Sequence, residues 1–143
     1  MRRFGERVKP GMRYTPRPGA YVILQRGGDI LLTIQDGEEP ELQLPGGGID
    51  AGEHVIHALH REVMEETGWR MGRPVRLGAF RRFAFMPEYG LWAEKICTVY
   101  LARPSLRLGP PLEAGHHAIW VPITEAPALL TNEGDAAFVA SLL

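Results

Sequence analysis

Three glutamates recur at helical spacing within a segment of helical periodicity: Glu62, Glu65 and Glu66. On an α-helix their side chains fall within an arc of about 100°. Glu62 and Glu66 stand four residues apart, and such a like-charge pair costs an isolated helix roughly 0.2–0.5 kcal/mol. A purely structural helix gains little from this arrangement, whereas a hard divalent cation needs such oxygen ligands, and Mg²⁺ fits best. The spacing therefore predicts a metal site on one helix face.

Glycines and two further charged residues flank these acids. The run Gly46-Gly47-Gly48 precedes the helix and permits close approach of a ligand or metal to backbone oxygens. It is not a Walker loop, because the Gly-Lys-Ser/Thr ending is absent. Glu53 stands near the helix start, where the helix dipole favours a carboxylate. Arg61 can reach Glu65, but one cation does not neutralise three acids.

Together these residues match a pattern of known spacing. Five residues separate Gly47 from Glu53, and seven more separate Glu53 from the run Arg61-Glu62-Val63-Met64-Glu65-Glu66-Thr67-Gly68-Trp69. Positions 47–69 resemble the complete Nudix box, including its bulky apolar positions. At average residue frequencies, a chance match in this chain is below roughly 10⁻⁶. The surrounding order of elements is also similar to the Nudix fold, an α/β/α sandwich with a mixed β-sheet.

The resemblance implies Mg²⁺-dependent hydrolysis of a pyrophosphate bond in a nucleoside diphosphate linked to another group, X. Mn²⁺ is the alternative ion. X belongs to the ADP-ribose, dinucleoside polyphosphate, nucleotide sugar or nucleoside triphosphate class. By the same resemblance Arg61 orients the glutamates by pairing with Glu53. The implied metal ligands are Gly46 (through its backbone carbonyl), Glu62, Glu65 and Glu66. The implied catalytic residues are Glu53, Arg61, Glu65 and Glu66. The general base is open among Glu53, Glu66, Glu88, Glu94 and Glu113.

Aromatic and basic residues surround the predicted loop over residues 86–90. A nucleobase can stack on aromatic faces, and arginines can hold phosphate. The plainer interpretation is that the alternating Phe83 and Phe85 belong to the core of a strand, and it is favoured for these two. The candidate substrate-binding residues are therefore Arg81, Arg82, Tyr89 and Trp92.

The histidines and the one cysteine have plain interpretations. His54, His57 and His60 follow helical spacing and are expected on the exposed helix surface rather than in a metal site. The pair at 116 and 117 follows Glu113 in a predicted loop, where a surface role is favoured over contact with substrate. Cys97 is expected to be a small core residue.

Length and composition indicate one soluble globular domain. The chain has 143 residues, of which 45% are hydrophobic and 23% charged. These values exclude a disordered chain, a collagen-like fibre and a coiled coil. Apolar alternation and turn residues predict strands, helices and an α/β domain with a mixed sheet. The strands are expected over residues 20–25, 30–34, 42–44, 75–85, 91–102 and 118–121. The helices are expected over residues 53–67, 125–130 and 135–143.

Charge is unevenly placed along the chain. Residues 1–17 hold six basic residues and one acid, whereas the whole chain has a net charge of −1. We expect an irregular basic N-terminal arm over residues 1–19 and a single domain over residues 20–143. A solvated terminus is the favoured role for the arm. The chain has no secretory signal pattern and no run of ~18 apolar residues, so a cytoplasmic location is expected.

Two alternative functions remain beside the enzyme acting on a small nucleotide. One is a nucleotide sensor without turnover, which is disfavoured because every acid of the box is present. The other is a pyrophosphohydrolase acting on the 5′ end of RNA, which draws on the basic arm alone. The expected partner is a small nucleotide-derived substrate. A nucleic acid is disfavoured, no membrane is expected, and a homodimer is left open.

Overall fold

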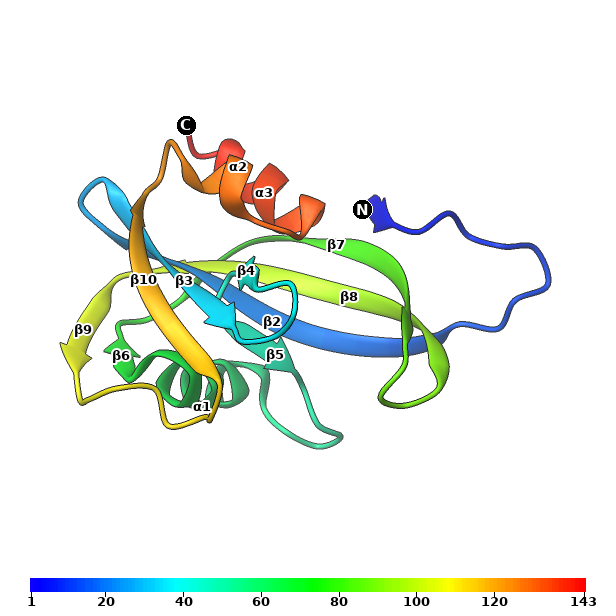
Figure 1. Ribbon diagram of the computed structural model, residues 1–143, viewed down its shortest axis with the longest axis horizontal. Helices are drawn as coiled ribbons and strands as arrows, with labels where there is room; N and C mark the ends of the chain where they lie inside the picture. The colour runs from blue at the N-terminus through cyan, green and yellow to red at the C-terminus, as the bar shows by residue number, and fades with distance from the viewer.

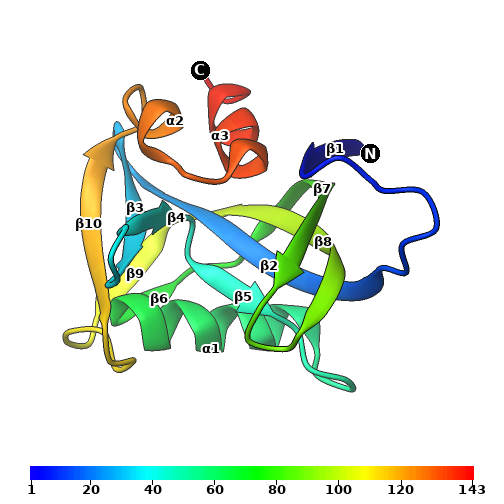
Figure 2. The ribbon, with the colours of Figure 1, turned by 45° about the vertical axis from the view of Figure 1, so that its right-hand side comes forward.

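The computed structural model describes residues 1–143 as three layers. A β-sheet lies between α1 (Val55–Thr67) on one face and α2 (Ala126–Leu129) and α3 (Glu133–Ala140) on the other (Figures 1 and 2). The predicted α/β/α sandwich is therefore confirmed. None of the three helices has the length and apolarity needed to span a membrane.

The sheet is mixed and has eight strands, in the order β1-β7-β8-β2-β3-β10, with β4 beside β3 and β5 beside β2. The pairs β1–β7 and β2–β8 are parallel, and the others are antiparallel. Two short strands, β6 and β9, form a separate ribbon. The strand bounds are β1 Arg2–Gly5, β2 Thr15–Arg26, β3 Asp29–Gln35, β4 Glu41–Gln43, β5 Gly46–Gly48, β6 Trp69–Met71, β7 Val75–Met86, β8 Leu91–Ala102, β9 Pro104–Arg107 and β10 His116–Pro122.

The middle of strand β2, residues 20–24, is buried on both faces, which explains its uninterrupted apolar sequence. Val22 and Leu24 pack in a cluster with Leu59 and Val63 of α1. Ile23, between them, packs on the opposite face against the helices α2 and α3. Successive residues of a strand point to opposite faces, so both layers need apolar residues here. The strand therefore holds the centre of the fold, and β5 is paired directly to it.

Helix α1 is bounded by caps that fix its acidic face. The side chain of His54 accepts a hydrogen bond from the backbone N–H of Ile56 at 3.3 Å. Gly68 ends the helix with a positive φ of 76°, a conformation that favours glycine. The helix thus begins two residues later than predicted and ends where predicted. Because Leu59 and Val63 face the sheet, Glu62 and Glu65 lie on a partly exposed side of the helix, whereas Glu66 is buried.

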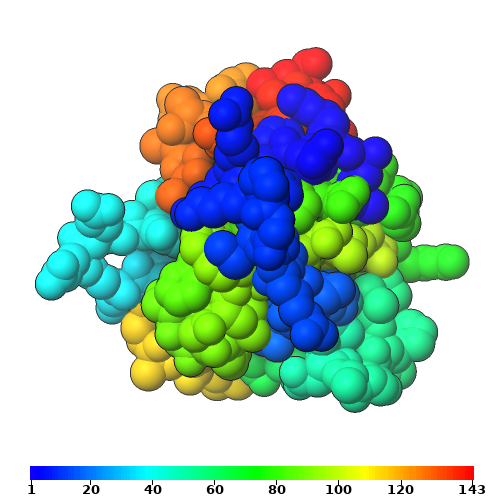
Figure 3. All heavy atoms as spheres, turned by 90° about the vertical axis from the view of Figure 1, so that its right-hand side faces the viewer, coloured from blue at the N-terminus to red at the C-terminus, as the bar shows by residue number.

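Parts of the predicted irregular arm, residues 2–5 and 15–19, lie in strands, which corrects the expectation for them, whereas residues 6–14 form neither helix nor strand. Residues 2–5 form β1 alongside β7, and β2 already begins at Thr15. Tyr14 packs edge-to-face on Phe83 with ring centroids 5.1 Å apart. In Figure 3 the segment runs over the face formed by β7 and β8. Both strands pair with residues about 80 positions away, and local sequence patterns carry no signal for such pairings.

Candidate metal and substrate site

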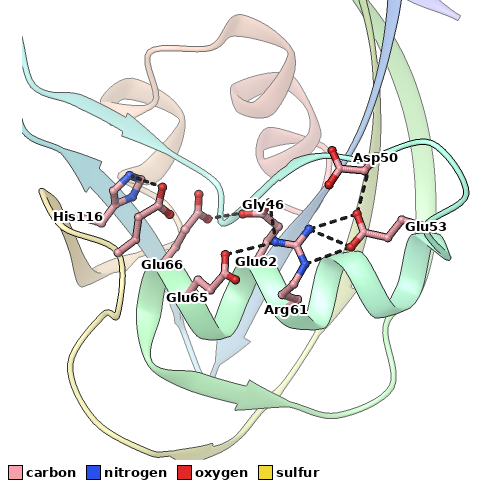
Figure 4. A network of polar contacts seen from close by, with 9 residues as sticks. Gly46, Asp50, Glu53, Arg61, Glu62, Glu65, Glu66 and His116 are labelled. Carbon is pink, nitrogen blue, oxygen red and sulfur yellow. Dashed lines mark hydrogen bonds and ion pairs between the residues drawn. The ribbon is translucent and has the colours of Figure 1, made fainter.

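Arg61 joins three carboxylates into one network on the exposed side of α1 (Figure 4). Its Nε and Nη2 donate to the two carboxylate oxygens of Glu53, each at 3.1 Å. Its Nη1 donates to Glu62 and to Glu65, each at 3.3 Å. The predicted pairing of Arg61 with Glu53 is thus present as a two-pronged contact. A planar guanidinium suits this geometry, because its donors form a rigid fork.

Glu53 is held by the backbone as well as by Arg61. The N–H of Asp50 donates to Glu53 Oε1 at 3.2 Å. This hydrogen bond, and then the guanidinium of Arg61, lower the pKa of Glu53 below its usual range. The carboxyl is therefore ionised at neutral pH and serves as a fixed anchor for Arg61.

Glu66 is the most enclosed of the three helical glutamates. Its residue is 8% exposed, and its Oε2 accepts a hydrogen bond from the backbone N–H of Gly46 at 2.8 Å. Burial raises the pKa of Glu66 to about 8, and the charges of Glu62 and Glu113 add to this while the Gly46 N–H opposes it. Burial also raises the pKa of Glu62. A bound cation would relieve both effects, because it favours the ionised carboxylates.

Gly47 leaves the space that the carboxylate of Glu62 fills. A Cβ added at Gly47 would lie 2.9 Å from the carboxylate carbon of Glu62. The preceding Gly46 has a φ of 142°, and a Cβ there would collide with the backbone of β2. Gly46 and Gly47 therefore allow the backbone to lie directly against the carboxylates, because glycine has no Cβ.

Substitution of Gly47 by alanine is expected to weaken metal binding without unfolding the protein. The added methyl group displaces the Glu62 carboxylate, and misplaced ligands typically cost roughly 10–100-fold in metal affinity. Gly48→Ala is the matched control, because a Cβ there meets nothing closer than the Pro18 carbonyl oxygen at 4.0 Å. Isothermal titration with Mg²⁺ should separate the two variants, and equal affinities would show that Gly47 has no such role.

A later segment completes the acidic cluster. The backbone N–H groups of Leu112 and Glu113 donate to the carbonyl oxygen of Glu65 at 2.8 and 3.0 Å. Glu113 thereby joins Glu62 and Glu65 in one group whose potential ligand atoms lie within 4.8 Å of one another. The same holds for a second group, formed by Glu66, Glu113 and His116. The donors are mostly carboxylate oxygens, a set that suits Mg²⁺ or Mn²⁺.

A cavity of about 460 Å³ opens beside the glycine run, between the loop after β5 and the loop joining β7 to β8. We call it the Tyr89 cavity. Gly48 lines this cavity. The cavity therefore begins one residue after Gly47, whose backbone lies against the Glu62 carboxylate. The guanidinium carbon of Arg17 lies 4.5 Å from the centroid of the Tyr89 ring. The charged and aromatic residues that line the cavity are Arg17, Tyr21, Asp50, Glu88, Tyr89 and Lys95.

A separate, small polar recess of about 60 Å³ shares the lining residues Tyr21 and Lys95 with this cavity. We call it the Asp135 recess. Asp135 is 3% exposed, in the first turn of α3. Burial raises its pKa to about 7, although the Leu44 N–H and the charges of Arg82 and Lys95 oppose the shift. The recess therefore holds a carboxyl group that changes charge near neutral pH.

This buried carboxyl group predicts a specific pH dependence of stability. Between about pH 4 and pH 7 the folded protein holds a proton on Asp135 that the unfolded chain has released. The resulting stabilisation is complete below about pH 4 and is lost as pH rises through about 7. We expect the melting temperature of Asp135→Asn, relative to wild type, to rise from pH 4 to 7 and then level off. Calorimetry of Glu133→Gln, a neighbouring exposed carboxylate in the same helical turn, should show no such rise.

The predicted substrate residues are placed in different surroundings. Tyr89 lines the Tyr89 cavity, and Arg82 lines the Asp135 recess. Arg81 instead pairs with Glu94 at 2.9 Å, and it lines neither space. Trp92 packs between Lys9 of the arm and neighbouring aromatic rings. Contact with substrate stays a prediction for all four, with structural support at Tyr89 and Arg82.

Three residues that the sequence interpretation does not assign to the site are further candidates for function. Arg17 was assigned to the irregular arm, but it lies at the edge of β2 in the cavity. Lys95 carried a signal, because it stands at a core-facing position between Ala93 and Cys97 in an otherwise apolar alternation. His116 was expected on a loop surface, yet it opens β10 and its side chain is only 11% exposed.

The sequence and fold of the chain are similar to those of known proteins. The family model described as the NUDIX domain matches residues 15–142. Among solved structures, a MutT NUDIX hydrolase from Burkholderia pseudomallei is 27% identical, with a TM-score of 0.72 over 90% of this chain and 99% of that chain. A NUDIX hydrolase from Nitrosomonas europaea is 21% identical, with a TM-score of 0.71 over 90% of each chain, and supports the fold.

Two named relatives match over shorter segments. A protein of Bacillus subtilis (strain 168) named as an 8-oxo-dGTP diphosphatase is 34% identical over 74 residues, which cover 52% of this chain and 50% of that protein. An RNA pyrophosphohydrolase of Halorhodospira halophila (strain DSM 244 / SL1) is 34% identical over 67 residues, 47% of this chain and 37% of that protein. The match thus spans half or less of each relative. With the family model covering nearly the whole sequence, the chain belongs to the Nudix family.

Proposed function

We propose that the protein hydrolyses a phosphoanhydride bond in a nucleoside diphosphate linked to X, with Mg²⁺ or Mn²⁺ as cofactor. The observation that carries the proposal is the convergence of five glutamates around Arg61 and Gly46, namely Glu53, Glu62, Glu65, Glu66 and Glu113. A cavity of ligand size with two cations, Arg17 and Lys95, opens beside them. The relatives' names make nucleoside triphosphates, and 8-oxo-dGTP in particular, the first substrates to test.

In this proposal Glu62, Glu65 and Glu66 would hold the metal, with the Gly46 carbonyl as a further ligand. Such a metal would supply positive charge for the phosphate oxygens and favour ionisation of the attacking water. Arg61 orients two of the ligands through the hydrogen bonds of its Nη1. The Gly46 N–H orients the third by its bond to Glu66.

Two of the five candidate general bases have surroundings that support the role of base. Glu94 is paired with Arg81. Glu88 lines the Tyr89 cavity and belongs to neither group of potential metal ligands. Glu53 has a lowered pKa, which makes it a weak base. The remaining candidates are Glu66 and Glu113, which share one group of ligating atoms. We propose that one of these two accepts the proton of the attacking water.

The nucleoside part of the substrate is proposed to occupy the Tyr89 cavity. Tyr89 is 58% exposed and presents an aromatic face for stacking. Arg17 and Lys95 supply positive charge for phosphate groups on the way to the carboxylates. The Asp135 recess, which shares Tyr21 and Lys95 with the cavity, offers further hydrogen-bonding groups.

A substrate panel with Mg²⁺ tests the proposal. It should contain 8-oxo-dGTP, the ordinary nucleoside triphosphates, ADP-ribose, dinucleoside polyphosphates and nucleotide sugars, with product analysis by chromatography. We expect turnover of one class, lost in Glu65→Gln. Tight binding of one nucleotide without turnover of any would support a nucleotide sensor instead.

Action on the 5′ end of RNA is a second candidate, favoured by the basic N-terminal segment. This segment is docked on β7 and β8, and Arg17 at its end lines the Tyr89 cavity. One relative is named as an RNA pyrophosphohydrolase. Deleting residues 1–17 would also remove strand residues that pair with β8, so substitution is the better test. The exposed set Arg7, Lys9 and Arg13 should be changed to glutamine.

The matched control changes three exposed arginines elsewhere to glutamine, namely Arg70, Arg73 and Arg76. If RNA is the substrate, the arm variant should lose turnover of triphosphorylated RNA and show a weaker salt dependence of binding. Equal RNA binding and turnover in the two triple variants would exclude this role for the arm.

A further inference from the structure

His116 brings a nitrogen donor to the acidic cluster. Its Nε2 lies 3.6 Å from Oε1 of Glu113, longer than a hydrogen bond. Its Nδ1 is buried and has no hydrogen-bond partner. A buried ring nitrogen without a partner costs free energy, so a histidine with a purely structural role would be expected to find one. Nε2 is the ring nitrogen that lies beside Glu113. One ring nitrogen of His116 and one carboxylate oxygen each of Glu66 and Glu113 all lie within 4.8 Å of one another.

These three donors are fixed by separate parts of the fold. Glu66 is held by the Gly46 N–H at 2.8 Å. Glu113 is held through its backbone N–H, which donates to the Glu65 carbonyl oxygen at 3.0 Å. His116 begins β10, where its position is set by pairing with Gln35 of β3. Three separate segments therefore bring these donors together, with the Glu66 carboxylate held by a hydrogen bond and the Glu113 side chain 48% exposed.

The chemistry of the two groups differs. Glu62, Glu65 and Glu113 offer oxygen alone, which suits Mg²⁺. Exchanging one carboxylate for an imidazole shifts preference toward first-row transition ions, because these bind nitrogen well and Mg²⁺ does not. We propose that Glu66, Glu113 and His116 form a second metal position that binds Mn²⁺ more tightly than Mg²⁺ through the imidazole of His116.

This position shares Glu66 and Glu113 with the proposed catalytic site. Its test reads metal coordination rather than turnover, so either proposal can fail without the other. The competing explanation is an ion pair between a protonated His116 and Glu113, which requires no metal. In that case removal of the imidazole leaves Mn²⁺ affinity unchanged.

The test is electron spin-echo spectroscopy of Mn²⁺ added to the metal-free protein. We expect nitrogen-14 coupling from one imidazole in the wild type and its loss in His116→Gln. His117→Gln is the matched control, because His117 is the next residue, is 61% exposed and pairs with Asp36 away from the cluster. It should keep the coupling. Absence of nitrogen coupling in the wild-type protein would overturn the proposal without reference to any variant.

Metal titrations supply the second readout. His116→Gln should lower Mn²⁺ affinity by roughly tenfold or more, on the scale of losing a metal contact. Mg²⁺ affinity should change by less than about twofold, since the oxygen-only group is intact, and this value also reports that the variant is folded. Equal Mn²⁺ affinities of wild type and His116→Gln would show that the imidazole is no ligand.

Discussion

Replacement of Glu66 by glutamine is expected to lower kcat by roughly 10²–10³-fold, the loss typical of removing one group that stabilises charge at a reacting centre. Glutamine keeps a side-chain oxygen that can accept the hydrogen bond from the Gly46 N–H. It removes the negative charge that the metal requires. Glu65→Gln should behave similarly, because Glu65 offers its carboxylate from the same helix face.

The same substitution should leave the metal-free fold at least as stable as the wild type. Burial raises the pKa of Glu66 to about 8, which means that its charge is unfavourable in the absence of a cation. Calorimetry without metal and steady-state kinetics with saturating Mg²⁺ would measure the two effects. Glu125→Gln, an exposed carboxylate outside the network, is the control. Full activity in both Glu65→Gln and Glu66→Gln would remove the basis of the proposed metal site.

Arg61→Ala should lose both stability and turnover. The guanidinium contacts Glu53, Glu62 and Glu65, all partly exposed. Pairs of this kind contribute up to about 1 kcal/mol each, so the loss is expected to be about 1–2 kcal/mol in the free energy of unfolding. Without Arg61 the carboxylates also repel one another and lose their orientation, which lowers kcat/KM.

Arg61→Lys separates charge from geometry. Lysine keeps the positive charge but lacks the fork that grips Glu53 in two places. We expect it to recover part of the stability and little of the rate. Added Mg²⁺ should narrow the difference in melting temperature between Arg61→Ala and wild type, since a cation again separates the acids. Arg70→Ala controls for loss of an exposed arginine, and wild-type kcat/KM in Arg61→Ala would contradict the orienting role.

The part of the site that lies on one helix was predictable from spacing alone. Glu62, Glu65 and Glu66 share a face because the helical period requires it, and the end of the helix follows from Gly68. Glu113 and His116 reach the same cluster from a segment about 50 residues later. Their contribution depends on how β10 aligns with β3, which no local pattern specifies.

The strands, too, divide into those with a local sequence signal and those without one. Those with regular apolar alternation, such as β7 and β8, were predicted within a residue or two of their bounds. Strand β5 consists of three glycines, which have no strand propensity, and it exists because β2 pairs with it. The strands β1, β6 and β9 have at most four residues and form by pairing with distant segments. Tertiary pairing, and not local preference, decides these elements.

The parallel pairing of β2 with β8 has a consequence for how the chain folds during synthesis. Residues 15–24 pair with residues 93–102. About 70 further residues must therefore be synthesised before β2 can begin to pair with β8. Such separation gives a high contact order, which slows folding because a long loop must close first. Helix α1, which carries the acidic box, can form early from local contacts. One edge of β2 stays unpaired until β8 emerges, and during this interval the nascent chain is most exposed to aggregation.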